Sequence, residues 1–242
     1  MNARTWRAGR QFYKRVSGPV EAGDLIVRAS ELSRAGGKTP VPGYCPDRSA
    51  VNFPMIEGAS GVALIDQVAL SYLLAPLQPL RRAGISELPP FDPFAKITVR
   101  LNAKTPQWLR ARLGALKDMP FEADGVVHGD FHCGQMILDE SGNLWLVDLD
   151  DMAQGPVEVD LGNFAAHLAT RPETRRRRLA EGLPFWAEQV QKAWDELGEV
   201  CNPTLFRRHV DIAVIRRALK LHDARGDSEI MAALEHLPLL SR

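Results

Sequence analysis

Residues 126–162 read VVHGDFHCGQMILDESGNLWLVDLDDMAQGPVEVDLG, and this stretch decides the fold. Ser-Gly-Asn at residues 141–143 predicts a hairpin turn. Asp130 therefore lies on a loop after one strand, and Asp148 lies at the end of another, so the hairpin could bring the two carboxylates together. Short apolar runs predict the buried strands: residues 126–127, 136–138 and 144–147.

These residue types suit one kind of chemistry. The carboxylates of Asp130 and Asp148 and the amide carbonyl of Gln135 are hard oxygen ligands, which favour Mg²⁺ over zinc. Phosphoryl transfer from a nucleotide uses such a site. One aspartate positions the attacking hydroxyl and accepts its proton, and another aspartate and an amide hold the metal.

At these residues the chain resembles the aminoglycoside phosphotransferase and choline kinase family, small-molecule kinases that are relatives of the protein kinases. The family pattern is His-Gly-Asp, an Asn five residues later, a strand ending in Asp, and a later Asp-Leu pair. Residues 128–130, Asp148 and residues 160–161 match this pattern, and Gln135 stands where Asn is usual. Gln offers the same carbonyl one methylene further out, as in maltokinase-like relatives.

The resemblance implies a two-lobed, protein-kinase-like α+β fold. A reduced N-terminal nucleotide-binding lobe would span residues 1–58, and a mainly helical C-terminal lobe would span residues 59–242. The implied activity is ATP- and Mg²⁺-dependent phosphorylation of a hydroxyl on a small molecule. Asp130 would be catalytic, and Gln135 and Asp148 would hold the metal.

The resemblance also implies where the nucleotide binds. Residues 4–16 alternate polar with apolar or aromatic residues and predict a strand hairpin that turns near Gly9, with Lys14 in its second arm. Lys14 would grip the phosphates and Glu31 would pair with it, with Glu21 as the competing partner. Residues 50–56 predict a strand, and the backbone at Glu57 and Gly58 would form the hinge that binds the adenine.

The N-terminal region departs from the family pattern. Only thirteen residues precede Lys14, and Gly9 is the one glycine among them, so no Gly-rich phosphate loop is present in this part of the sequence. This departure motivates a second hypothesis of another class: a catalytically weak or inactive kinase-like module with a binding or regulatory role. The presence of both Asp130 and Asp148 argues against it.

A third hypothesis is a zinc hydrolase that uses His128 and His132. Zinc needs a third ligand at a defined spacing, and the next histidine is His167, with no cysteine pair in support. We expect His128 to brace the catalytic loop through a hydrogen bond instead.

Helical periodicity and capping signals predict the remaining elements. Asp24, Asp160 and Ser228 are expected to cap three of these helices. The predicted helices are residues 25–35, 65–77, 107–117, 164–168, 184–197, 203–224 and 228–237.

Composition narrows the function classes. Thirty basic and thirty acidic side chains in 242 residues give a formal net charge of zero, which argues against a general nucleic-acid binder. Three scattered cysteines favour a reducing cytoplasm, and we expect neither a signal peptide nor a membrane span. The expected partner is a small-molecule hydroxyl substrate. The acceptor's identity, the choice of ATP or GTP and the oligomeric state stay open.

Overall fold

The computed structural model describes residues 4–85, 87–117, 124–172 and 178–241. The chain divides into two compact units, and each includes part of the stretch 126–162. Unit 1 is drawn from residues 1–89, 125–128 and 133–154, and unit 2 from residues 90–124, 129–132 and 155–242.

Unit 1 begins with the predicted hairpin. Strands β1 (Thr5–Ala8) and β2 (Gln11–Arg15) pair antiparallel, and Gly9 between them has the positive φ of 60° that such a turn favours. Strand β4 (Ala50–Pro54) pairs with β2 and with β3 (Gly43–Cys45), which gives the order β1-β2-β4-β3. The predicted strands are confirmed, and Lys14 lies in the second arm, opposite Val51.

Helix α1 (Pro19–Arg34) begins six residues earlier than the sequence indicated. Pro19 occupies the first helical turn, where its fixed φ and missing N–H cost nothing. Glu21 accepts hydrogen bonds from both the backbone N–H and the hydroxyl of Ser17. These two residues start the helix, so the prediction that Asp24 caps it was wrong. Leu25 packs with Val51 in the core of this region.

The single apolar helix predicted for residues 65–77 is replaced by three short ones: α2 (Gly61–Leu64), α3 (Leu70–Leu74) and α4 (Leu77–Arg82). Pro76 sits at the N-cap of α4, and proline breaks a continuous helical ladder. Leu73, Leu74, Leu77 and Leu80 are fully buried all the same. The apolar residues of this run indicated a buried segment, but the prediction of one continuous helix was wrong.

The central stretch forms its predicted hairpin. Strands β7 (Met136–Leu138) and β8 (Leu144–Leu146) pair antiparallel, and β6 (Gly125–Val127) pairs with β9 (Ala153–Gly155). The carboxylate of Asp139 holds the turn, because it accepts hydrogen bonds from the backbone N–H groups of Ser141 and Asn143 and from the Trp145 indole. Short 3-10 turns η2 (Cys133–Gln135) and η3 (Leu149–Asp151) flank the hairpin.

The predicted lobe boundary at residue 58 stays a prediction, and the two compact units do not divide there. Strand β5 (Ala59–Ser60) pairs with β7 immediately after that position. At Gly58 itself, an added Cβ would lie 2.1 Å from the carbonyl oxygen of Leu138. This close approach ties the segment around residue 58 to the β7–β8 hairpin.

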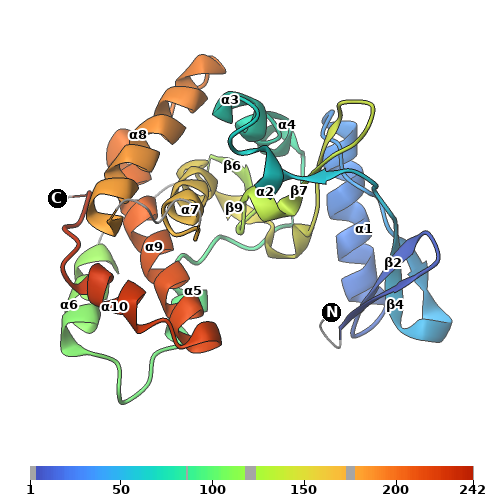
Figure 1. Cartoon of the computed structure of the whole chain (residues 1–242). Coiled ribbons are helices and arrows are strands. Elements are labelled where there is room, and N and C mark those ends of the chain that lie inside the picture. Colours follow the sequence, from blue (N-terminus) through green and yellow to red (C-terminus); the bar gives the residue numbers. More distant parts are fainter. Residues whose placement is uncertain (1–3, 86, 118–123, 173–177, 242) are drawn as a thin grey trace. The chain divides into compact units, whose positions relative to one another are not determined.

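Unit 2 is helical in its described residues, and α7 lies at its core. Helix α7 packs against α8 and α9 (Figure 1), and every residue of α7 except His167 is buried. The residues of the helices are α5 (Ala95–Thr98), α6 (Gln107–Lys117), α7 (Glu158–Ala169), α8 (Leu179–Glu196), α9 (Pro203–Arg225) and α10 (Ser228–Glu235).

Two predicted caps in unit 2 were wrong. Val157, not Asp160, occupies the N-cap of α7, and Asp160 lies inside the first turn. Asp227, not Ser228, caps α10, and its carboxylate accepts a hydrogen bond from the N–H of Ile230. In both cases the N-cap lies before the predicted residue, and Asp160 is left available for another contact.

Among the described residues, no helix combines the length and the apolar character that crossing a membrane requires.

The packing of α7 on α9 predicts a large effect at Gly162. A Cβ there would lie 2.7 Å from the carbonyl carbon of His209 and 2.8 Å from the nitrogen of Val210, so the helix backbones would have to separate. We expect Gly162→Ala to lower the free energy of unfolding by about 1–3 kcal/mol, as overpacking usually does.

Chemical denaturation measures this change, and Gly114→Ala is the matched control. Gly114 also lies within a helix, but a Cβ there would meet nothing within 4 Å. The control should gain about 0.5–1 kcal/mol from the higher helix propensity of alanine. Equal effects of the two variants would contradict the close approach at Gly162.

Candidate functional site

In unit 1, a lysine and two carboxylates from different elements meet. The Nζ of Lys14 on β2 lies 3.0 Å from Oδ1 of Asp148, which follows β8, and it also contacts Oδ2 of Asp150 in η3. The Lys14 side chain is only 17% exposed. Asp148 has a φ of 63°, a left-handed conformation that non-glycine residues rarely adopt. The backbone is therefore held in an unusual conformation at the residue that pairs with Lys14.

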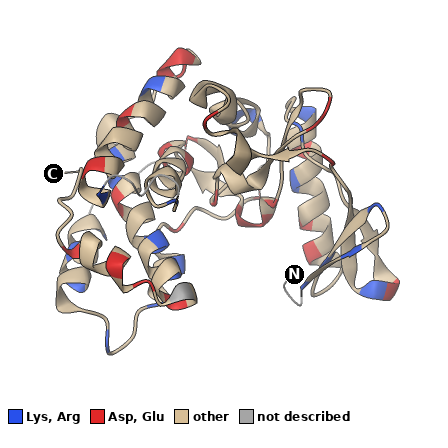
Figure 2. Cartoon of the chain, in the orientation of Figure 1, with Lys and Arg blue, Asp and Glu red and all other residues tan. Residues whose placement is uncertain are grey.

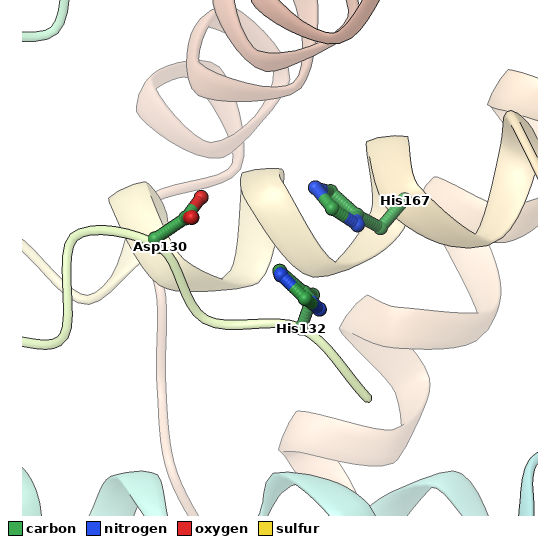
Figure 3. Close-up of side chains that lie close together, drawn as sticks. All are labelled: Asp130, His132 and His167. Atoms are coloured by element: carbon green, nitrogen blue, oxygen red, sulfur yellow. The ribbon is translucent and has the colours of Figure 1, made fainter. Parts of the chain in front are cut away.

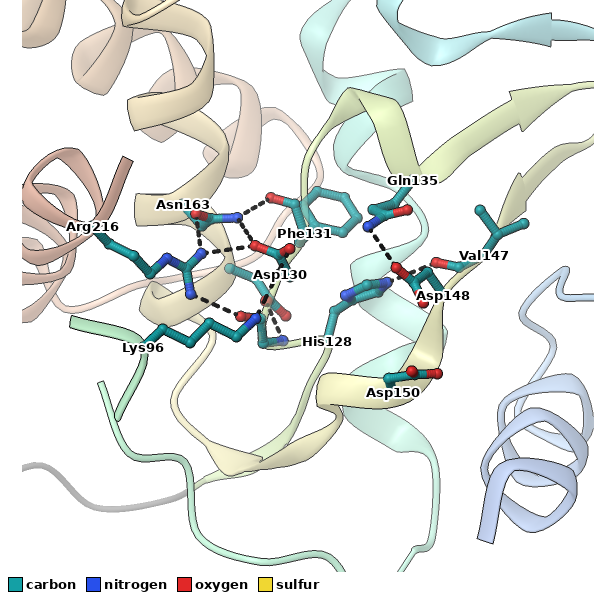
Figure 4. Close-up of polar contacts among 12 residues, drawn as sticks. Lys96, His128, Asp130, Phe131, Gln135, Val147, Asp148, Asp150, Asn163 and Arg216 are labelled. Carbon is teal, nitrogen blue, oxygen red and sulfur yellow. Dashed lines mark hydrogen bonds and ion pairs between the residues drawn. The ribbon is translucent and has the colours of Figure 1, made fainter. Parts of the chain in front are cut away.

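Gln135 completes this group. Its Nε2 donates to Oδ2 of Asp148 over 3.1 Å, so the two predicted metal ligands are brought together (Figure 4). Rotation of the Gln135 amide would turn its oxygen toward the same place. With Asp148 and Asp150, the donors are oxygens of the kind that Mg²⁺ prefers, and the Lys14 ammonium already lies beside both carboxylates. The residues present fit a magnesium ion.

The pKa shifts of Lys14 and Asp148 agree with an ion pair between them. Burial acts to lower the pKa of Lys14, but the hydrogen bond to Asp150 and the charges of Asp148 and Asp150 outweigh it and raise that pKa. Burial acts to raise the pKa of Asp148, but Lys14 and then the Gln135 hydrogen bond bring it below its ordinary value. Lys14 and Asp148 are both ionised at neutral pH.

Two further contacts fix the loop that carries Asp148. The fully buried His128 ring places Nε2 3.0 Å from the carbonyl oxygen of Val147, the residue before Asp148. The guanidinium of Arg28 on α1 donates to the carbonyl oxygens of Leu149 and Asp150 over 3.2 and 2.6 Å. The predicted bracing role of His128 is confirmed by this hydrogen bond.

The pairing of Lys14 with Glu31 was wrong. Glu31 forms its ion pair with Arg34 on the same helix. Glu21 accepts hydrogen bonds from Ser17, the main cause of its lowered pKa, and the charges of Arg4 and then Lys14 lower that pKa further. The ten residues from Glu21 to Glu31 correspond to about 15 Å along a helix, which explains why both cannot reach the same lysine.

Glu57 has an exposed side chain that lies 3.7 Å from the Arg10 guanidinium. An exposed pair of this kind contributes little to stability. The contact neither supports nor opposes adenine binding by the backbone at this position, so the hinge stays a prediction.

In unit 2, Asp130 is held by side chains from three elements. Its Oδ1 accepts from Nη2 of Arg216 on α9 over 2.9 Å and from Nδ2 of Asn163 on α7 over 3.4 Å, and its Oδ2 lies 3.9 Å from the ammonium of Lys96 on α5 (Figure 4). The Asp130 side chain is only 18% exposed. A partly buried carboxylate of this kind is kept charged by such partners.

The backbone of the Asp130 loop is fixed by the same elements. Asp160 accepts a hydrogen bond from the N–H of Gly129 over 3.0 Å, and Arg216 donates to the carbonyl oxygen of Gly129 over 3.2 Å. Asn163 donates to the carbonyl oxygen of Phe131 over 2.9 Å. Asp160, expected to cap α7, instead positions the loop from within the first turn of that helix.

These contacts set the charge of Asp130. Burial acts to raise its pKa, but the charges of Arg216 and Lys96, followed by those of His132 and Lys220, bring it below the ordinary value. Asp130 is therefore a carboxylate at neutral pH, able to accept a hydrogen bond or a proton.

The zinc hypothesis named the wrong histidine pair. In the described part of the chain, the residues grouped closely enough to hold a metal are Asp130, His132 and His167, and His128 is not among them. The rings of His132 and His167 stack with centroids 4.1 Å apart and planes within 9° (Figure 3). An imidazole binds a metal in its own ring plane, and two parallel stacked planes share no such point. Burial and nearby cationic groups hold the pKa of His167 well below its ordinary value, so this ring is neutral.

Comparison with known proteins agrees with this geometry. A family model described as the phosphotransferase enzyme family matches residues 52–200, more than half of the chain. The chain belongs to the phosphotransferase enzyme family. No curated protein matches the sequence.

Solved structures of kinases share the fold of the whole chain. A choline/ethanolamine kinase family protein from Mesorhizobium loti is 17% identical, covers 96% of this chain and 81% of its own, and has a TM-score of 0.62. Amicoumacin kinase in complex with AMP-PNP, Ca²⁺ and Ami is 12% identical, covers 97% of this chain and 87% of its own, and has a TM-score of 0.67. An aminoglycoside phosphotransferase from Streptomyces rimosus is 18% identical, with 86% of each chain covered and a TM-score of 0.58. The predicted kinase-like α+β fold and the predicted family are confirmed.

Sequence reasoning missed four residues that contact the predicted ones. Asp150 carried a signal, because it is a second carboxylate two residues after Asp148. The other three stand far from Asp130 in the sequence, and no local pattern connects them to it. They are Lys96, Asn163 and Arg216.

Arg216 offers a direct test of the electrostatics around Asp130. We expect Arg216→Met to raise the pKa of Asp130, because it removes the largest favourable charge while burial still opposes ionisation. Carboxyl ¹³C NMR titration of labelled aspartate measures the change.

Two further variants complete this titration. Arg216→Lys keeps a positive charge and should give a smaller rise. Arg100→Met is the control. Arg100 pairs with Asp223, which lies on the same helix as Arg216, and its removal should leave the pKa of Asp130 unchanged. If the pKa of Asp130 were unchanged in folded Arg216→Met protein, Arg216 would not be the group that sets it.

Proposed function

We propose that this phosphotransferase moves the γ-phosphoryl group of ATP, with Mg²⁺, to a hydroxyl on a small molecule. Several solved relatives contain adenine nucleotides, among them amicoumacin kinase with AMP-PNP and spectinomycin phosphotransferase with AMP. The observation that carries the proposal is the group formed by Lys14, Asp148 and Gln135. It combines a partly buried lysine ammonium, suited to phosphates, with oxygen donors suited to a metal.

Each residue then has a defined part. Lys14 binds the phosphates, and Asp148 and Gln135 hold Mg²⁺, with Asp150 as a further carboxylate beside Lys14. When bound, the ion supplies charge neutralisation for the phosphates. Asp130 orients the acceptor hydroxyl. The hydroxyl oxygen forms the new bond to the γ-phosphorus, the bond to the β–γ bridging oxygen breaks, ADP leaves with the bonding electrons, and Asp130 takes the hydroxyl proton.

The alternative of an inactive binding or regulatory module rests on the hairpin β1–β2. The turn between these strands consists of Gly9 and Arg10, so a Gly-rich phosphate loop is absent from the described residues 4–15. Under this alternative, metal-dependent phosphoryl transfer is absent and nucleotide binding is weak.

The role of Asp130 predicts a specific loss. We expect Asp130→Asn to lower turnover by about 10²–10⁴-fold, the usual contribution of a general base, because the amide cannot accept the hydroxyl proton. ATP affinity should change little, since the proposed nucleotide-binding groups are Lys14, Gln135 and Asp148. Steady-state kinetics with a hydroxyl library, together with calorimetric titration of ATP, separates the two effects. Comparable turnover in the variant would remove Asp130 from this role.

The role of Asp148 predicts magnesium-dependent nucleotide binding. Calorimetric titration of the full chain with ATP should show tighter binding in the presence of Mg²⁺, and Asp148→Asn should abolish that difference. The control is Glu140→Gln, which removes an exposed carboxylate from the β7–β8 turn and should behave like the parent protein. A folded parent protein that binds no ATP, with or without Mg²⁺, would favour the binding-module alternative.

A further inference from the structure

Positive charges gather around Asp130 in unit 2. Arg216, Arg217 and Lys220 lie within just over one turn of α9, and Lys96 approaches from α5. Figure 2 shows basic residues in blue along the helix that Figure 1 labels α9. The charges that act most strongly on Asp130 are those of Arg216, Lys96, His132 and Lys220. One carboxylate is therefore surrounded by several cationic groups.

Lys220 is the member of this cluster that is left available to a ligand. Its side chain is exposed, and within the part of the chain that the structure describes it makes no hydrogen bond and no ion pair. Desolvation and the charges of Arg217, Lys96 and Arg216 lower its pKa, and only Asp130 among its strongest neighbours raises it. An anion beside Lys220 would relieve this repulsion.

Both aspartates of α9, and Asp160 on α7, already have ion-pair or hydrogen-bond partners. Asp223 on α9 pairs with Arg100 over 2.7 Å, and Asp160 accepts from the N–H of Gly129. Asp211 is buried and accepts hydrogen bonds from the N–H groups of residues 240 and 241. A cationic acceptor would have to displace one of these contacts or approach Asp130 past several like charges.

We propose that the hydroxyl acceptor carries a negative charge, as a phosphate or carboxylate, which Lys220 binds while Asp130 receives the reacting hydroxyl. Arg216 and Lys220 are four residues apart on α9, so their side chains start about 5–6 Å from each other. The anionic group and the hydroxyl therefore stand one helical turn apart, a span that a small hydroxy acid or sugar phosphate bridges. This inference rests on the proposed function for the part played by Asp130.

The test uses four probes with one three-carbon skeleton: glycerol 3-phosphate, glycerate, glycerol and 3-amino-1,2-propanediol. NMR titration of the full chain, without nucleotide, measures their dissociation constants. We expect the two anions to bind more tightly than glycerol, and the amine to bind most weakly. Lys220→Ala should weaken anion binding by about two- to fivefold, the range for one exposed charge contact, and Lys220→Arg should restore most of it.

Lys192→Ala is the matched control. It removes the same charge from α8, where Lys192 is paired with Glu188, and anion binding should be unchanged. Equal loss in the two alanine variants, or binding of the amine as tight as that of the anions, would overturn the proposal.

Phosphoryl-transfer assays with the same four compounds separate this inference from the proposed function. Lys220-dependent anion binding without transfer from ATP to any hydroxyl compound supports the charge preference and removes the kinase role. Transfer that favours the amine supports the kinase role and overturns the charge preference.

Discussion

A carboxylate that is largely removed from water needs a compensating charge, and the compensation of Asp130 organises unit 2. Its partner Arg216 lies 86 residues further along the chain, on the long helix α9. The same guanidinium also bonds to Gly129 and to Asn163 on α7. Removing one member would leave a partly buried charge without its partner, which costs more than losing an exposed ion pair. The packing of α7 against α9 therefore serves the loop geometry as well as the core.

That dependence explains the close approach at Gly162. Asn163, the residue after Gly162, reaches both Asp130 and Phe131 from a helix whose backbone closely approaches that of α9. Asp160, one turn earlier on α7, bonds to the backbone of the same loop. The two polar residues that hold the loop therefore flank the position where α7 and α9 pack most closely.

The sequence predicted what local chemistry determines. The hairpin of residues 136–146, the position of Lys14 on β2, the grouping of Gln135 with Asp148 and the bracing by His128 all follow from short patterns in which turn residues and apolar runs alternate. What failed depended on tertiary context. Glu31 was chosen by family position, although the start of α1 at Pro19 brings Glu21 toward Lys14 instead. Arg216, Asn163 and Lys96 reach Asp130 from other helices, and helical periodicity alone cannot indicate which polar residue faces a distant loop.

The low pKa of Asp130 bears on how it would act. A carboxylate stabilised by Arg216 and Lys96 is a weak base, so it gains little by removing a proton early. Phosphoryl transfer with a loose transition state has little need for early deprotonation, because the attacking hydroxyl becomes acidic only as the new bond forms. Arg216 therefore lowers the basicity of Asp130 but fixes the orientation of its carboxylate, which positions the hydroxyl. The positive charges that lower the pKa of Asp130 would also favour a negatively charged acceptor. The low basicity of Asp130 and the proposed preference for an anion therefore have the same cause, the cationic side chains around Asp130.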